Sequence, residues 1–180
     1  MKKILIRIGQ VLFWLLVIGL AGVMTGFLFP ERLVVHGHWS IPCNSDTIRA
    51  HLRTAQGLSA VLPFMEDAER YTKIPYGSQE KNAGVAWYAR ETGHLKAYAE
   101  FLKESQDSGV FVGLNFREKG KALMRFLPRA AADGTTQLEW HYEARFGNNP
   151  IARFFGFELR PLVTRTFSSV PSEAVSELCQ

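Results

Sequence analysis

The feature that most constrains this 180-residue chain is an uninterrupted apolar run near its N-terminus. The run extends from Ile8 to Phe29 and contains no charged residue. An apolar stretch of about 18 or more residues is long enough to cross a bilayer as a helix, and it exceeds the usual core helix. We therefore expect a transmembrane helix over residues 8–29, preceded by a short cytoplasmic N-terminus over residues 1–7.

The charges that flank the run predict its orientation. Lys2, Lys3 and Arg7 precede it, and segments rich in Lys and Arg stay on the cytoplasmic side of a membrane. The rest of the chain would then lie outside the cytoplasm. A cleaved signal peptide is the alternative, but it has a shorter apolar core and small residues before the cleavage site. Here the run ends in "GFLF", which favours an uncleaved anchor.

The net charge of +4 does not indicate a nucleic-acid partner. Three of the 21 Lys and Arg residues precede the apolar run, whereas all 17 Asp and Glu residues follow it. The 18 basic residues that remain leave the rest of the chain near +1. Binding to a phosphate backbone relies on a basic excess, so we predict no nucleic-acid binding.

A strand follows a short link over residues 30–32. In "LVVHGHWSI", Val35 and Trp39 fall on one face, whereas His36 and His38 fall on the other, as in a strand with one buried face. Two histidines at this spacing are able to bind one zinc ion, with His141 as the best third ligand. The alternation that places Trp39 inside places both histidines outside, however, so we expect solvent-exposed side chains and no metal site.

The middle of the chain predicts two short helices followed by a sheet. Asn44 or Ser45 is a suitable N-cap for the first helix, and we expect the break between the helices near Gly57. From Ala68 onward, apolar segments separated by Gly-containing turns predict several antiparallel strands. The last of them, "TTQLEWHYEARF", alternates strictly between apolar and polar residues, which indicates one buried and one wet face.

The C-terminal part predicts a long apolar helix. Asn149 is a suitable N-cap and Pro150 suits the first helical position. Ile151, Phe154, Phe155 and Leu159 are expected to form a broad apolar face. Pro161 is expected to kink or break the helix. A second helical piece would then follow, with these apolar positions: Leu162, Val163, Phe167, Val170, Val175 and Leu178.

Three of these segments resemble the START / Bet v 1-like (SRPBCC) superfamily, and within it the bacterial polyketide cyclase/dehydrase-type proteins with an N-terminal membrane anchor. They are "FPERLVVHGHWSIPCNSDTIRAHL", "GVFVGLNFREKGKALMRFLP" and "TTQLEWHYEARFGNNPIARFFGF". The resemblance covers residues 33–180. It implies a helix-grip fold of the α+β class, in which a curved antiparallel sheet wraps around a C-terminal helix and two short helices follow the first strand.

The resemblance also implies a function. Members of this superfamily mostly bind lipids, sterols or polyketides in a cavity between sheet and helix, and some are cyclases or hydrolases. Aromatic residues of the sheet and last helix would form either a filled core or the wall of such a cavity. The candidate ligand-binding residues are Trp87, Met124, Phe126, Trp140, Tyr142, Phe154 and Phe155.

We therefore expect a binding domain for an apolar or amphipathic, lipid-like molecule, anchored in the bacterial inner membrane with the domain in the periplasm or outside the cell. The alternatives are an enzyme of the polyketide cyclase or hydrolase type that uses the same cavity, and a protein-interaction module without a ligand. No catalytic motif identifies an enzyme, although Tyr88, Tyr98 or Tyr142 would be able to donate a proton. No phosphate-binding loop is present, and we predict no cofactor.

The two cysteines, Cys43 and Cys179, match no zinc or redox spacing. In a helix-grip arrangement the far end of the last helix lies near the corner between the first strand and the first helix. The resemblance therefore implies a disulfide between Cys43 and Cys179, which would require an oxidising compartment. Two free thiols remain the alternative.

Overall fold

The computed structural model of the chain describes residues 2–65, 67–77, 82–117, 120–132, 134–168, 170 and 177–179. Side chains are described for these residues except 2–6, 155, 158 and 177. The helices are α1 (Lys2–Gly26), α2 (Ser45–Leu52), α3 (Ala55–Val61), α4 (Pro150–Ser168) and the 3₁₀ helix η1 (Glu177–Cys179). The strands are β1 (Arg32–Ile41), β2 (Tyr71–Tyr76), β3 (Gly84–Ala89), β4 (Leu95–Ser105), β5 (Gly109–Phe116), β6 (Gly120–Ala130) and β7 (Thr136–Arg145).

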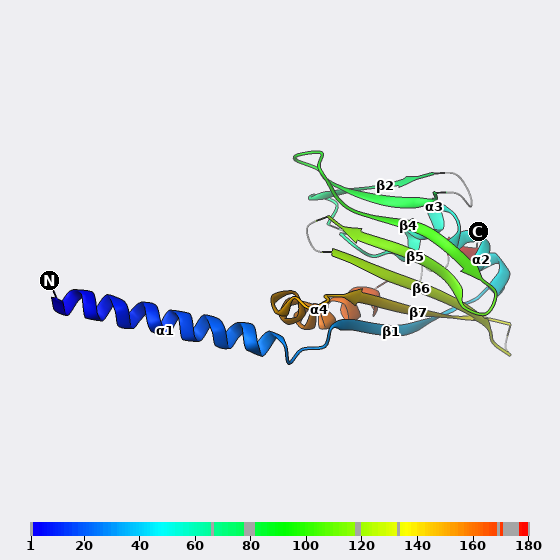
Figure 1. Cartoon of the computed structure of the whole chain (residues 1–180). Coiled ribbons are helices and arrows are strands. Elements are labelled where there is room, and N and C mark those ends of the chain that lie inside the picture. The colour runs from blue at the N-terminus through cyan, green and yellow to red at the C-terminus, as the bar shows by residue number, and fades with distance from the viewer. Residues whose placement is uncertain are drawn as a thin grey trace.

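The described strands form one curved antiparallel sheet in the order β1-β7-β6-β5-β4-β3-β2 (Figure 1). Consecutive strands from β2 to β7 are neighbours, and the last of them returns to pair with β1. The two ends of the folded domain's sequence thus meet at one edge of the sheet. The α+β class and the helix-grip architecture expected from the sequence are confirmed.

The alternation seen in the sequence fixes which face of the sheet is buried. Val35 of β1 lies opposite Tyr142 of β7, and both are buried, whereas His36 and His38 are exposed. Helices α2, α3 and α4 contribute to the core that covers this face, through residues such as Ile48, Leu58 and Phe167. The opposite face of the sheet carries the polar residues of the same strands, as expected for an antiparallel sheet with one wet face.

The two short helices are separated at Thr54 and not near Gly57, so the predicted position of the break was wrong. The Thr54 hydroxyl donates to the carbonyl of His51 (2.8 Å) and accepts from the Gly57 N–H (3.0 Å), which ends one helix and caps the next. Gly57 lies inside α3, and the carbonyl of His51 leaves no room for a Cβ there. The glycine therefore permits a close approach between the helices. At the first helix, Asn44 is the N-cap.

Helix α4 begins as predicted, but Pro161 does not break it. The side chain of Asn149 accepts from the N–H groups of Ile151 (3.0 Å) and Ala152 (3.1 Å), and Pro150 is the first helical residue. The helix continues through Pro161 to Ser168. Pro161 itself is exposed. Of the apolar positions predicted for a second piece, Leu162, Val163 and Phe167 belong to α4 itself, Leu178 is fully buried in η1, and Val175 lies outside the described residues.

Helix α1 ends at Gly26, three residues before the predicted end at Phe29, and extends away from the sheet (Figure 1). Gly26 packs so closely on Pro150 that no Cβ fits between them. The ring of Phe29 then turns back onto α4, with ring centroids 5.5 Å from Phe154 and 5.0 Å from Phe157. The exit from α1 is therefore packed directly against the start of α4.

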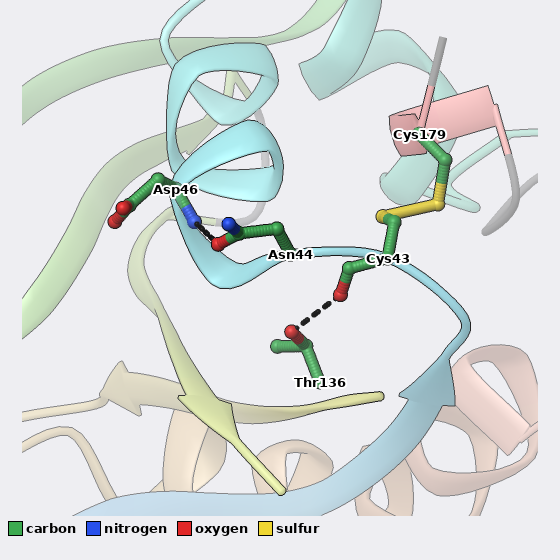
Figure 2. Close-up of a disulfide and its surroundings, with 5 residues drawn as sticks. All are labelled: Cys43, Asn44, Asp46, Thr136 and Cys179. Atoms are coloured by element: carbon green, nitrogen blue, oxygen red, sulfur yellow. Dashed lines mark hydrogen bonds between the residues drawn. A yellow bond between two sulfur atoms is a disulfide. The ribbon is translucent and has the colours of Figure 1, made fainter. Parts of the chain in front are cut away.

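The C-terminus is joined to the corner between β1 and α2 by a disulfide. Figure 2 shows the bond between Cys43 and Cys179, whose Cα atoms are 5.7 Å apart. The carbonyl of Cys43 accepts a hydrogen bond from the Thr136 hydroxyl (2.6 Å), which fixes this corner to the start of β7. Leu178, beside Cys179, lies in the same core as α2 and α3.

Candidate functional site

A cavity of about 290 Å³ lies between the sheet and α4. Four parts of the chain meet there: the loop after α3, the facing ends of β5 and β6, the end of β7 and the middle of α4. The lining residues are Pro63, Phe64, Met65, Phe116, Gly120, Lys121, Tyr142, Ala144, Arg145, Phe146, Leu159, Leu162, Val163 and Thr166. The cavity is close to the lower end of the range of about 300–1,000 Å³ that is usual for small-molecule sites.

The inner wall of the cavity is apolar and buried. Tyr142 and Ala144 point inward because they occupy alternate positions of β7, and Val163 of α4 faces them. Phe64, in the loop after α3, closes the wall with ring contacts to Phe116 (5.5 Å) and Tyr142 (6.3 Å). The loop after α3 thus crosses the inner face of the sheet, and the ring of Phe64 shields the strands there from water.

The exposed lining residues mark the mouth of the cavity. Lys121, Arg145 and Leu162 are exposed, whereas Tyr142, Ala144 and Val163 are buried. Arg145 lies opposite Arg32, the first residue of β1. The mouth therefore opens at the end of the sheet where β1 begins. Helix α1 extends from this same end (Figure 1).

Backbone contacts join the mouth to the segment that leaves α1. Phe146, a lining residue, donates its N–H to the carbonyl of Glu31 (2.9 Å). The carboxylate of Glu31 is paired with the buried guanidinium of Arg153 (2.8 Å), which also donates to the carbonyl of Gly147 (2.7 Å). The guanidinium lies 5.8 Å from the ring centre of Phe27. These contacts fix the anchor exit, the end of β7 and the start of α4 as one unit.

The polar groups of the cavity are few. Burial raises the pKa of the Tyr142 hydroxyl to about 12, so this group is a neutral hydrogen-bonding group at physiological pH. It forms no hydrogen bond with any other described residue, and Lys121 has no ion-pair partner in the described part of the chain. Arg145 pairs with Glu143 (2.8 Å) at the surface. Among the described lining residues there is no Asp, Glu, His or Cys.

This set of groups suits binding better than catalysis. General acid–base catalysis uses groups whose pKa lies near the working pH, and a nucleophile needs a base beside it. The described lining residues offer neither. They do offer an apolar interior, one buried hydroxyl and a cationic rim, which together match an amphipathic molecule whose apolar part lies inside.

Four of the predicted site residues lie in the core and not at the cavity. Trp87, Met124, Phe126 and Trp140 are buried, and none of them lines the cavity. Trp140 is stacked on Phe167 with ring centroids 4.7 Å apart, and its ring occupies the space above Gly37. Of the four, Trp140 was assigned to the buried face by the strand alternation, and it lies there. All four belong to the hydrophobic core, together with residues of α2, α3 and α4.

Of the remaining three, Tyr142 lines the cavity and Phe154 does not. Phe154 is partly exposed and contacts Phe29 on the outer side of α4. Phe154 and the lining residue Leu159 are five positions apart, about 140° around a helix, so Phe154 lies on the outer side of α4 while Leu159 reaches the cavity. The broad apolar face predicted for α4 is thus divided between the surface, with Ile151 and Phe154, and the cavity, with Leu159. The side chain of Phe155 lies outside the described residues.

The sequence reasoning missed the loop residues Pro63, Phe64 and Met65 and the rim residue Lys121. The α4 contribution was present in the sequence as the i, i+3, i+4, i+7 series that is formed by Leu159, Leu162, Val163 and Thr166. No periodic pattern in a sequence indicates that a loop crosses a sheet, so the sequence did not predict that Phe64 lines the cavity.

The other predicted polar groups lie away from the cavity. His36 and His141 face each other across β1 and β7 with ring centroids 5.8 Å apart. Burial, the nearby Arg125 and His36 lower the pKa of His141. His38 lies opposite Glu139, and no group of three or more metal-ligating side chains occurs among the described residues.

Neither of the other two candidate proton donors reaches the cavity. Tyr88 and Tyr98 are half-buried and are not lining residues. The Tyr98 hydroxyl accepts a hydrogen bond from the Asn115 amide (2.9 Å). The site thus contains one of the three candidate tyrosines, Tyr142.

Comparison with known proteins identifies the fold and not a closer relationship. No family model and no curated protein matches the chain. A Staphylococcus aureus protein of unknown function is similar in structure, with a TM-score of 0.58 and 11% identity over 82% of this chain and 93% of that chain. Truncated norcoclaurine synthase from Thalictrum flavum gives a TM-score of 0.55 and 13% identity over 82% and 93% of the two chains.

A Rhodobacter sphaeroides protein is also similar, with a TM-score of 0.50 and 13% identity over 83% of this chain and 94% of that chain. Identities this low indicate a shared fold alone. The chain therefore has a Bet v 1-like helix-grip fold, preceded by a helix that is long and apolar enough to cross a membrane over Arg7–Gly26.

Proposed function

We propose that this chain is a membrane-anchored binding protein of the START / Bet v 1-like superfamily that holds one apolar or amphipathic, lipid-like molecule. The observation that carries the proposal is the cavity between the sheet and α4, with its apolar inner wall, the buried Tyr142 hydroxyl and the exposed Lys121 and Arg145 at the rim. Apolar walls with a few polar groups are typical of small-molecule sites.

The proposal includes the location of the protein. Helix α1 would cross the bacterial inner membrane, with Lys2, Lys3 and Arg7 on the cytoplasmic side and the sheet in the periplasm or outside the cell. The disulfide between Cys43 and Cys179 supports this orientation, because such bonds persist in oxidising compartments and are rare in the cytoplasm.

The two alternative functions have less support. An enzyme of the cyclase or hydrolase type would need convergent acid–base groups, and the described lining residues include one tyrosine and no carboxylate or histidine. Norcoclaurine synthase, which has the same fold, has been solved with dopamine and hydroxybenzaldehyde, so small molecules are bound by at least one protein of this fold. An interaction module without a ligand would be expected to have a filled core, and here a cavity is present.

Native mass spectrometry of the full chain in detergent tests the proposal, with palmitic acid added as the probe. We expect binding to saturate at one palmitate per chain. The variant Ala144→Phe fills the inner wall of the cavity, whereas Ala130→Phe adds the same ring at an exposed position of the neighbouring strand β6. A steric cost of about 1–3 kcal/mol predicts a loss of affinity of about 5-fold to 150-fold for Ala144→Phe and none for Ala130→Phe.

Two results would contradict the proposal. One is the absence of a saturable one-to-one palmitate adduct on the wild-type chain. The other is an equal adduct on both variants, which would assign the bound lipid to α1 or the detergent and not to the cavity. The thermal midpoint of each variant, measured in the same detergent, shows whether Ala144→Phe still folds.

A further inference from the structure

Exposed apolar side chains are concentrated at one end of the molecule. Outside α1, nine large apolar residues are exposed among the described side chains, and six of them lie at the exit from α1 or on α4. These six are Phe27, Leu28, Ile151, Phe154, Phe157 and Leu162, whereas Val34, Ile74 and Leu102 are scattered over the sheet. Single exposed apolar residues need no explanation, but a contiguous group indicates a contact surface.

Four of the six form a stripe along α4, which we call the α4 stripe: Ile151, Phe154, Phe157 and Leu162. Their spacing places them within one side of the helix, and the opposite side packs on the core through Val163 and Phe167. Helix α4 also carries two exposed cations: Arg165 falls on the same side of the helix as the stripe, about one turn beyond Leu162, and Arg160 falls outside it. An exposed apolar stripe with basic residues beside it is the pattern of a helix that lies in a membrane interface.

The stripe is continuous with α1 at one end. Gly26, the last residue of α1, packs on Pro150, and Phe29 contacts both Phe154 and Phe157. If α1 crosses the bilayer over residues 7–26, Gly26 lies at the membrane boundary, and the beginning of α4 lies there with it. The bilayer is therefore the surface that is nearest to the stripe.

At its other end the stripe reaches the cavity. Leu162 belongs both to the stripe and to the cavity lining, and Lys121 and Arg145 stand at the same rim. An apolar path thus runs from the exit of α1, along α4, to the cavity mouth. The cations at the rim are placed where anionic lipid headgroups would lie if the stripe were inserted among acyl chains.

We infer that α4 lies in the interface of the membrane that α1 crosses, with the α4 stripe inserted among lipid chains, so that the cavity opens onto the bilayer and not onto water. This inference rests on the proposed anchoring by α1. It adds a second, non-covalent contact with the membrane and a route by which a lipid-like molecule passes between bilayer and cavity without crossing water.

The test uses the full chain in vesicles of phosphatidylethanolamine and phosphatidylglycerol, with one introduced cysteine carrying a nitrobenzoxadiazole fluorophore. Ile151→Cys reports on the stripe, and Leu102→Cys on β4 is its control, since the native side chains are 57% and 55% exposed. Phe157→Cys and Ile74→Cys on β2 form a second pair, with native exposures of 47% and 45%. Labelling is done without reductant, so that the Cys43–Cys179 bond stays closed.

We expect emission from positions 151 and 157 to shift to shorter wavelength, to be quenched by nitroxide-labelled lipids and to be protected several-fold from aqueous iodide. Emission from positions 102 and 74 should be quenched by iodide alone. The thermal midpoint of each labelled variant shows whether it is folded. Agreement between the two pairs of positions excludes a local folding defect at one site.

The same sample distinguishes the two ways of failing. If the chain does not float with the vesicles, the proposed anchoring by α1 is wrong, and the inference falls with it. If the chain floats but positions 151 and 157 are as accessible to iodide as their controls, the anchor stands and the interfacial position of α4 is overturned.

Discussion

Removal of the disulfide between Cys43 and Cys179 should be among the most destabilising changes to the folded domain. The two residues are 136 positions apart, so the bond closes nearly the whole domain into a loop. The chain-entropy model assigns about 5 kcal/mol to a loop of this length. We therefore expect the double variant Cys43→Ser, Cys179→Ser to lose up to about 5 kcal/mol of unfolding free energy.

The structure also predicts what happens to the C-terminus in this variant. Burial of Leu178, which is fully enclosed, contributes about 1.5–3 kcal/mol. Ordering the three residues of η1 costs about 1–2 kcal/mol each. The total ordering cost of about 3–6 kcal/mol exceeds the burial term, so η1 should detach from α2 and α3 when the bond is absent, and carboxypeptidase should then remove it.

The loss of unfolding free energy is measured by urea unfolding of the full chain in detergent, monitored by tryptophan fluorescence. Reductant should bring the wild-type chain to the stability of the double variant and should leave the double variant unchanged. A loss below about 1 kcal/mol would refute the reasoning, because the closed loop would then not constrain the unfolded chain. A C-terminus that resists carboxypeptidase in the double variant would show that η1 is held by packing alone.

Two further predictions concern the cavity. Because burial raises the pKa of Tyr142 from about 10 to about 12, the stability that comes from keeping its hydroxyl neutral is present below pH 10 and is lost as the pH rises toward 12. Measured by urea unfolding, the free energy of unfolding of the wild-type chain should fall by about 1 kcal/mol more than that of Tyr142→Phe between pH 9 and pH 11. An equal pH dependence of the two free energies would contradict the buried position of the hydroxyl. Lys121→Glu at the rim should weaken palmitate binding several-fold in native mass spectrometry and leave hexadecanol binding unchanged, whereas an equal effect on both probes would exclude a headgroup contact.

The sequence predicted the strands well because strand periodicity is a property of consecutive residues. The alternation in β1 and β7 assigned Val35, Trp39, Tyr142 and the exposed His36 to the correct faces. The N-caps of α2 and α4 were also found, since a capping side chain acts on the backbone two or three residues away.

The predictions failed where the outcome depends on distant contacts. Gly57 was taken as a helix break, but its role is to approach the carbonyl of His51 from the neighbouring helix. Pro161 was expected to kink or break α4, but the helix continues through it to Ser168. In both cases the residue type was informative, and the surroundings decided its effect.

The sequence by itself determined that this chain has an apolar segment long enough to cross a membrane and a sheet with one buried face. Both follow from local patterns, which the covalent order of the residues fixes. Only the tertiary structure decided which apolar residues fill the core and which surround a cavity, because the cavity is formed where the loop after α3, the end of β7 and α4 meet. The same is true of its mouth, which lies beside the exit of α1 because β7 returns to pair with β1.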